Sequence, residues 1–345
     1  MTSEIDKARG RFLRLWQEDP RPWHIAYSGG KDSALLLQLA LEVAREQSTP
    51  KEIIVAFNDT RYEVDGKLER IERNFSRIAA TGLAKPKILR PKPRDTILVR
   101  IIGDGYAPPD FRFRYCTRYS KMDPSLASEK ELAARSGGCL TFSGTRKEES
   151  TDRLRRLTKN GSPESLIPRR KRLKIDDSFP LADVKTSELW GYLEGLGTFI
   201  WGETIDELKE LYPGDTVAQR DGCWLCTVCA EKSSCEKQCT PGQTKIRRFI
   251  RAIKEDPEKR RLCKLENHKK RLEKGLASGY FTMEARQEIL DVVQEVEREE
   301  NRRYISDEEI AHIREIWGGG RKGFYLGNLT RFRAKRKVEN VRDFD

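Results

Sequence analysis

The chain has 345 residues, enough for a substantial core and for two domains. It carries 67 Lys and Arg against 55 Asp and Glu, a formal net charge of +12, and this excess favours a polyanionic partner such as nucleic acid. No apolar run is as long as a membrane span, and the polar start over residues 2–6 lacks the apolar segment of a secretory signal, so we expect a cytoplasmic protein with no membrane partner.

The first predicted element is a helix over residues 4–19, because Ile5, Phe12 and Trp16 recur at helical spacing. We expect this helix to cover an edge of a sheet. The apolar run from Trp23 to Tyr27 then predicts a buried strand.

A glycine turn joins this strand to a strongly apolar helix that begins near Ser33, and its six residues are Ser28, Gly29, Gly30, Lys31, Asp32 and Ser33. A strand, a glycine turn and a helix N-terminus together present backbone N–H groups and a positive dipole end to a phosphate. The turn is shorter than a Walker loop and lacks the three spaced glycines of the dinucleotide fingerprint. A plain connector is the alternative, but the intact hexapeptide favours a phosphate site.

The next strand is predicted over residues 52–57 and ends in Asp59 and Thr60. Its carboxyl end should lie beside the first strand, where open parallel sheets bind ligands, so Asp59 is a candidate nucleotide-binding residue. A cap for the following helix, which includes Ile71, explains Asp59 and Thr60 equally well. A third strand is predicted at residues 86–89, whereas residues 96–102 fit a helix or a strand.

A basic segment from Arg112 to Lys121 surrounds the thiol of Cys116, which suits an anionic substrate or a cluster ligand, although an ordinary basic loop is the alternative. A fourth strand over residues 140–143 runs into Gly144 and Arg146. A glycine directly after a strand, followed by an arginine, predicts a second phosphate-binding turn, because planar guanidinium matches phosphate well.

Residues 153–174 are rich in Arg and Lys and predict an exposed basic loop, either a polyanion contact or a solvated surface. The segment 179–193 predicts a short strand followed by a helix, with Thr186 as its N-cap. Alternating strands and helices predict an α/β fold with a doubly wound, mostly parallel sheet over residues 1–215. Residues 216–345 would hold a cysteine-rich segment and a basic helical region. Within this region, residues 245–300 are expected to be helical, and the basic and aromatic tail 321–337 either grips nucleic acid or packs internally.

Five of the eight cysteines lie between Cys223 and Cys239, which in a cytoplasmic chain argues for metal or redox chemistry over disulfides. The spacing Cys223, Cys226, Cys229 repeats a C-x-x-C step that brings thiolates to one metal. Zinc would accept such sulfurs, but the run is closer to a ferredoxin pattern than to the separated pairs of a zinc ribbon. Cys139, at a strand start, is expected to be a small buried hydrophobe.

Several of these segments resemble one superfamily. SGGKDS resembles the pyrophosphate loop of the ATP-pyrophosphatase family, and RYCTRYSKMDP and GTRKEES resemble motifs of the phosphoadenosine-phosphosulfate reductase group. GCWLCTVCAEKSS resembles DndC-type proteins, the ATP-pyrophosphatase component of DNA phosphorothioation systems, although the cysteine that usually precedes this stretch is missing. This difference is compatible with the related Ssp-type branch.

The resemblance implies an ATP pyrophosphatase and sulfurtransferase that adenylylates a DNA backbone phosphate and replaces an oxygen with sulfur. It implies ATP and Mg²⁺ on the two turns, with Lys31, Asp32 and Arg146 in catalysis and Asp59 and Gly144 also at the nucleotide. It further implies a [4Fe-4S] cluster, for which the predicted ligands are Cys116, Cys223, Cys226 and Cys235, with Cys229 as the competitor for the last position.

The expected partners are DNA, a cysteine desulfurase as sulfur donor and other phosphorothioation-system proteins. The alternatives are thiolation of a tRNA base, reduction of an adenylylsulfate, and a catalytically idle DNA-binding or redox-sensing module.

Overall fold

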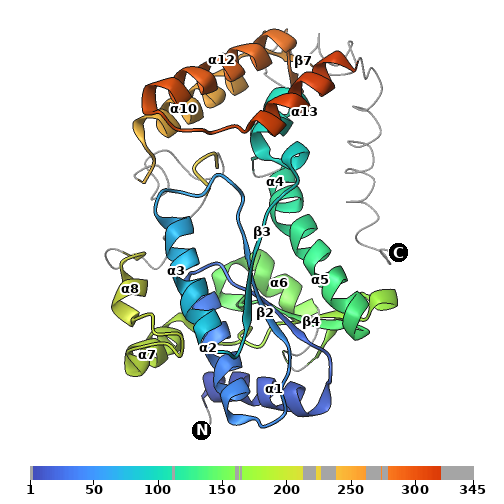
Figure 1. The fold of residues 1–345 in the computed structure, drawn as a ribbon, viewed down its shortest axis with the longest axis vertical. Coiled ribbons are helices and arrows are strands. Elements are labelled where there is room, and N and C mark those ends of the chain that lie inside the picture. The colour runs from blue at the N-terminus through green and yellow to red at the C-terminus, as the bar shows by residue number, and fades with distance from the viewer. Residues whose placement is uncertain are drawn as a thin grey trace. The chain divides into compact units, whose positions relative to one another are not determined.

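The computed structural model describes residues 3–110, 113–159, 163, 165–212, 223–226, 238–261, 273 and 279–319. The chain forms two compact units that alternate along the sequence (Figure 1). The sheet unit comprises Met1–Asp59, Gly66–Leu89 and Pro124–Asp221, and the cysteine unit comprises Thr60–Asp65, Arg90–Asp123 and Gly222–Asp345. The predicted domain boundary at residue 215 stays a prediction.

The described part of the sheet unit is built on a six-stranded sheet in the order β3-β2-β1-β4-β6-β5. Its neighbouring strands are parallel except for β5, which pairs antiparallel to β6. The α/β class and the mostly parallel sheet predicted from the sequence are therefore confirmed. The strands are β1 (Trp23–Ala26), β2 (Ile53–Asn58), β3 (Lys85–Leu89), β4 (Cys139–Phe142), β5 (Ile167–Arg170) and β6 (Ile175–Ser178).

Helices cover both faces of this sheet (Figure 1), and the side chains of β2 alternate between two cores accordingly. Ile53, Val55 and Phe57 pack in the main core with one set of helices, whereas Ile54 packs on the opposite face with Leu132. Successive strand residues point to opposite faces, so a sheet buried on both sides needs this continuous apolar run. The main core includes α1 (Glu4–Glu18), α2 (Lys31–Glu46), α3 (Lys67–Ala80), α7 (Thr186–Leu196) and α8 (Ile205–Lys209), and the opposite face carries α5 (Asp123–Ser136).

The first helix packs against the middle of the sheet, so the expectation that it covers an edge is wrong. The ring of Phe12 lies 5.4 Å from that of Trp23 on β1 and 5.0 Å from that of Phe142 on β4, measured between centroids. β1 and β4 are the two central strands. Large aromatic side chains on α1 are buried most completely over the widest apolar surface, which is the centre of the sheet.

The basic segment after the fourth strand contains regular structure, so the prediction of a loop over residues 153–174 is wrong, whereas most of its described residues are exposed or partly exposed, as expected. It includes α6 (Thr151–Lys159), β5 and the short helical turn η5 (Lys171–Leu173). The short helical turn η4 (Lys147–Glu149) precedes α6. Leu157 on α6 is 4% exposed, and β5 gains its hydrogen bonds from β6. Tertiary pairing therefore orders a stretch whose charge alone favours solvation.

The segment before α7 also differs from its prediction. The strand lies at Ile175–Ser178 rather than beginning at Phe179, and Lys185 is the N-cap of α7 without a side-chain hydrogen bond. Thr186 is instead the first residue of the helix, and both its backbone N–H and its hydroxyl donate to Glu148, at 2.7 and 2.8 Å.

The described part of the cysteine unit is mainly helical. Ile246, Ile250 and Ile253 share a buried face of α10, as the helical spacing predicts. The segment 96–102, which the sequence left between helix and strand, is helical from residue 97 onward, and its π-helical turn is Val99–Gly103. The elements are η1 (Pro93–Asp95), η2 (Val99–Gly103), α4 (Tyr115–Thr117), η3 (Arg118–Met122), α10 (Pro241–Glu255), β7 (Arg260–Arg261), β8 (Tyr280–Phe281), α12 (Met283–Glu300) and α13 (Asp307–Gly318).

Among the described helices, none combines the length and the apolar character needed to cross a membrane. The predictions for Arg112, Cys229, Cys235 and the tail 321–337 fall outside the described residues.

Candidate functional site

Two predicted phosphate turns leave the carboxyl ends of adjacent central strands. β1 pairs in parallel with β4, and from β1 the strand order runs to β2 and β3 on one side and to β4 and β6 on the other. Open α/β sheets bind ligands in the crevice outside such a reversal of strand order. Residues 27–30 follow β1 and residues 143–146 follow β4, so both turns lie at this place.

Gly144 brings the second turn against the backbone of the first. A Cβ atom added at Gly144 would lie 2.7 Å from the carbonyl oxygen of Asp32, 3.0 Å from its carbonyl carbon and 3.3 Å from the nitrogen of Ser33. Backbone atoms cannot rotate away as a side chain can. Gly144 is therefore required by the close approach of the two turns, whether or not it also contacts a phosphate.

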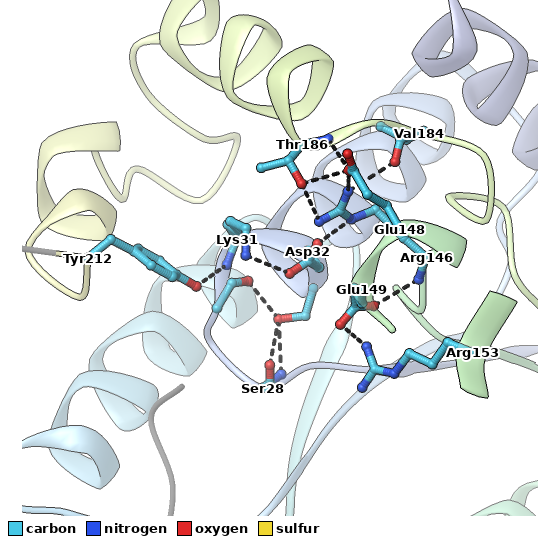
Figure 2. A network of polar contacts seen from close by, with 12 residues as sticks. Ser28, Lys31, Asp32, Arg146, Glu148, Glu149, Arg153, Val184, Thr186 and Tyr212 are labelled. Atoms are coloured by element: carbon cyan, nitrogen blue, oxygen red, sulfur yellow. Dashed lines mark hydrogen bonds and ion pairs between the residues drawn. The ribbon is translucent and has the colours of Figure 1, made fainter. Parts of the chain in front are cut away.

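Arg146 joins the second turn to α2 and α7, as Figure 2 shows. Its side chain is 2% exposed, and its Nε donates to Oδ1 of Asp32 at 2.5 Å. Its terminal nitrogens donate to Glu148 at 3.1 Å, to the carbonyl oxygen of Val184 at 3.0 Å and to the hydroxyl of Thr186 at 3.1 Å. The guanidinium thus positions Asp32 and closes the turn, and its direct contact with phosphate stays a prediction.

The loop between β1 and α2 is folded by its own serines. The backbone N–H of Ser28 donates to Oγ of Ser33 at 3.1 Å, and that hydroxyl donates to the carbonyl oxygen of Gly30 at 2.9 Å. Gly30 is the N-cap of α2 and, as a glycine, provides no side-chain cap for the positive end of this helix. Such an end suits an anion.

Lys31 contacts a tyrosine that the sequence analysis did not single out. The hydroxyl of Tyr212 accepts a hydrogen bond from the backbone N–H of Lys31 at 3.0 Å, and Nζ of Lys31 lies 5.1 Å from the centre of the Tyr212 ring (Figure 2). The same ammonium lies 3.2 Å from Oδ2 of Asp32. Trp190 packs edge-on against the Tyr212 ring at 5.4 Å. A tyrosine after a short helix has no motif spacing that could have indicated this role.

Asp59 and Thr60 do not cap the following helix, because the N-cap of α3 is Gly66. Asp59 is 4% exposed at the end of β2, and its backbone N–H donates to the carbonyl oxygen of Leu89 at 2.9 Å. This removes the capping alternative, and the nucleotide-binding role of Asp59 stays a prediction.

In the cysteine unit, Trp224 anchors the turn that carries Cys223 and Cys226. Trp224 is 2% exposed, and its ring packs edge-on against Tyr62 and Tyr304 at 5.8 and 5.4 Å. Its backbone N–H donates to the carbonyl oxygen of Tyr62 at 2.8 Å. Within the turn, the backbone N–H of Cys226 donates to the carbonyl oxygen of Cys223 at 2.9 Å. The tryptophan between the two cysteines therefore fixes the turn on the core of this unit.

Cys116, Cys223 and Cys226 interact within the cysteine unit. Burial raises the pKa of Cys116, and the neighbouring Cys226 raises it further. Burial also raises the pKa of Cys223 well above its ordinary value, and Glu63, Cys226 and Cys116 add to this effect because their negative charges oppose the thiolate. Segments more than a hundred residues apart in the sequence thus bring three predicted ligands into electrostatic contact.

These three thiols fit an iron–sulfur cluster or zinc by the chemistry of their donors, since soft metals prefer thiolates. Cys235, the fourth predicted ligand, and its competitor Cys229 lie outside the described residues. Across the described ranges, no group of three or more His, Cys, Asp or Glu side chains has the arrangement of a finished metal site. The cluster therefore stays a prediction.

Cys139 is a buried hydrophobe, as predicted. It is 0% exposed among apolar residues on the α5 face of the sheet, and burial raises its pKa to about 12. Its thiol is therefore neutral at ordinary pH, so Cys139 is a suitable control for the other cysteines.

A reversal of strand order, two adjoining glycine turns and a helix N-terminus together form the arrangement at which α/β proteins bind nucleotides. The family model described as the phosphoadenosine phosphosulfate reductase domain matches residues 22–229, which is more than half of the chain. The chain therefore belongs to this family, which supports chemistry on nucleotides and sulfur. The comparison with curated proteins gave no match.

Proposed function

We propose that this protein is an ATP pyrophosphatase and sulfurtransferase that converts DNA backbone phosphates into phosphorothioates. The observation that carries the first half of this proposal is the contact between the two glycine turns at the reversal of strand order. Gly144 abuts the backbone of Asp32, and Arg146 holds the carboxylate of the same residue. Two segments more than a hundred residues apart are thereby organised around one helix N-terminus.

In this proposal the turn from Ser28 to Ser33 binds the departing pyrophosphate through backbone N–H groups and through Lys31. Asp32, oriented by Arg146, would be the residue that holds a divalent ion on the phosphates, since Mg²⁺ prefers carboxylate oxygens. Tyr212 occupies the N–H of Lys31, so phosphate and the tyrosine hydroxyl would compete for this donor.

DNA is proposed as the substrate because the cysteine turn resembles that of DndC-type proteins and because the chain carries a net charge of +12. The exposed cations of α6, Arg155, Arg156 and Lys159, follow directly after the second turn and would bind the DNA backbone. DNA, a cysteine desulfurase and other phosphorothioation-system proteins are the proposed partners.

The proposed reaction balances in two displacements. A non-bridging oxygen of the DNA phosphodiester attacks the α-phosphorus of ATP, and the bond to pyrophosphate breaks. A sulfur nucleophile at the oxidation level of sulfide then forms a P–S bond with the DNA phosphorus, and AMP leaves with the former DNA oxygen. The sulfur originates as a persulfide on the desulfurase and is released by a thiol reductant. An iron–sulfur cluster held by Cys116, Cys223, Cys226 and Cys235 would supply the site of this sulfur chemistry.

The test is an assay of pyrophosphate release with anaerobically purified protein, ATP, Mg²⁺ and DNA, followed by mass spectrometry of nuclease-resistant dinucleotides. We expect release that depends on DNA and dinucleotides that contain sulfur. Lys31→Ala should abolish release, whereas Lys85→Ala, whose side chain is 72% exposed on β3, should not. Sulfur in tRNA nucleosides instead of DNA would favour base thiolation and contradict the proposed substrate.

A second candidate is a reductase that acts on an adenylylsulfate, which the family match favours. Such an enzyme would release sulfite from the adenylylsulfate with a thiol as reductant and would not cleave ATP. Sulfite production without pyrophosphate release would establish this candidate in place of the first.

A further inference from the structure

Arg70 on α3 contacts the first phosphate turn, although no motif includes it. Its NH1 donates to the carbonyl oxygen of Gly29 at 2.9 Å. We propose that Arg70, held by the buried carboxylate of Glu203, is a positioning residue that orients the peptide groups of this turn for phosphate. This inference rests on the proposed use of the turn as a nucleotide site.

The carboxylate behind Arg70 is completely buried. Glu203 is 0% exposed, forms an ion pair with NH2 of Arg70, and accepts a hydrogen bond from the indole nitrogen of Trp201 at 3.0 Å. A buried ion pair whose two partners each make a further hydrogen bond holds its side chains in one geometry. Glu203 therefore directs one side of the guanidinium, and the other side is left to hold the turn.

The turn has little freedom at this contact. Gly29 has a φ of +79°, in the left-handed region, and an added Cβ would lie 2.7 Å from Cδ1 of Ile71 and 3.3 Å from NH1 of Arg70. Ile71, which is 0% exposed, limits the turn on one side, while Arg70 draws its carbonyl oxygen toward α3. Two consecutive residues of one helix thus define the position of the Gly29 peptide.

This orientation matters for an anion. A carbonyl oxygen carries a partial negative charge and would repel a phosphate, whereas the N–H groups that follow it attract one. With its carbonyl oxygen bound to Arg70, Gly29 cannot turn that oxygen toward the phosphate.

Single substitutions at this pair do not separate positioning from stability, because removing one partner leaves the other charge buried and destabilises the fold. The decisive variant replaces both residues, as R70M with E203M. Two apolar side chains of similar length can replace a buried ion pair with little loss of stability. Neither can bind the carbonyl oxygen of Gly29.

We expect the double variant to fold with a thermal midpoint lowered by no more than the loss of the Trp201 hydrogen bond to Glu203 explains, while its Kd for ATP and for inorganic pyrophosphate, with Mg²⁺, rises at least tenfold. Amide hydrogen exchange should accelerate in a peptide that spans residues 28–33. Arg77→Met with Glu207→Met is the matched control, since this partly exposed ion pair links α3 to α8 and does not contact the turn. It should leave both Kd values unchanged.

The inference is overturned if the double variant binds both ligands as tightly as the wild type, or if affinity falls equally in the control. It is also overturned if the double variant does not fold while the single variant Arg70→Met folds and binds both ligands with wild-type affinity. If the wild type binds neither ATP nor pyrophosphate, the proposed function fails and the inference fails with it. If the wild type binds both ligands and the double variant binds them equally well, the inference is refuted while the proposed function stands.

Discussion

The close contact at Gly144 lets us predict how much Gly144→Ala lowers the stability of the protein and its affinity for ATP. The added methyl group would lie 2.7 Å from the carbonyl oxygen of Asp32, whereas ordinary contacts begin near 3.4 Å. The two turns must therefore separate by about 0.7 Å, and overpacking of this kind costs about 1–3 kcal/mol. A shift of this size at a reacting centre lowers activity by about a hundredfold. We expect a lower thermal midpoint and a weaker affinity for ATP.

Gly191→Ala is the matched control, because an added Cβ at Gly191 in α7 meets nothing within 4 Å. Alanine is favoured over glycine inside a helix by about 1 kcal/mol, so this variant should be slightly more stable and should bind ATP normally. Calorimetry of ATP binding and thermal unfolding of the three proteins test the argument. A Gly144→Ala protein with wild-type affinity and stability would falsify the close contact between the turns.

Further predictions concern other parts of the two units. Trp224→Ala should lower the free energy of unfolding by about 3–5 kcal/mol, because it removes a buried ring, and urea denaturation compared with Trp224→Phe measures this loss. Burial holds the pKa of His24 at about 4 against an ordinary 6.5, so the unfolded chain binds the proton more readily than the folded protein. The free energy of unfolding should therefore fall by up to about 3 kcal/mol as the pH drops from 6.5 to 4. Urea denaturation of His24→Gln should show a shallower decline over that range. After anaerobic purification, Cys226→Ser should lose iron and sulfide whereas Cys139→Ser should keep both; equal metal content in the two variants would remove Cys226 from the ligand set.

Local sequence patterns predicted most of the sheet unit. The apolar runs at β1, β2 and β4 and the glycine turns that follow them were recognised because a strand buried on both faces is continuously apolar and ends abruptly. The errors lie where tertiary contacts prevail over local preference. β5 is highly basic and exists because β6 offers it hydrogen bonds, and Thr186 leaves the capping position because Glu148 accepts its hydrogen bonds.

The sequence by itself determined the α/β class, the two glycine turns and three thiols of the candidate cluster, because each depends on the order of residue types over a few positions. The tertiary structure decided what those residues contact. Gly144 faces a backbone rather than open space, Arg146 is bound to Asp32, and Arg70 and Tyr212 reach the first turn from distant segments. Contacts of this kind depend on how helices pack over the sheet, and a pattern confined to neighbouring residues carries no information about that packing.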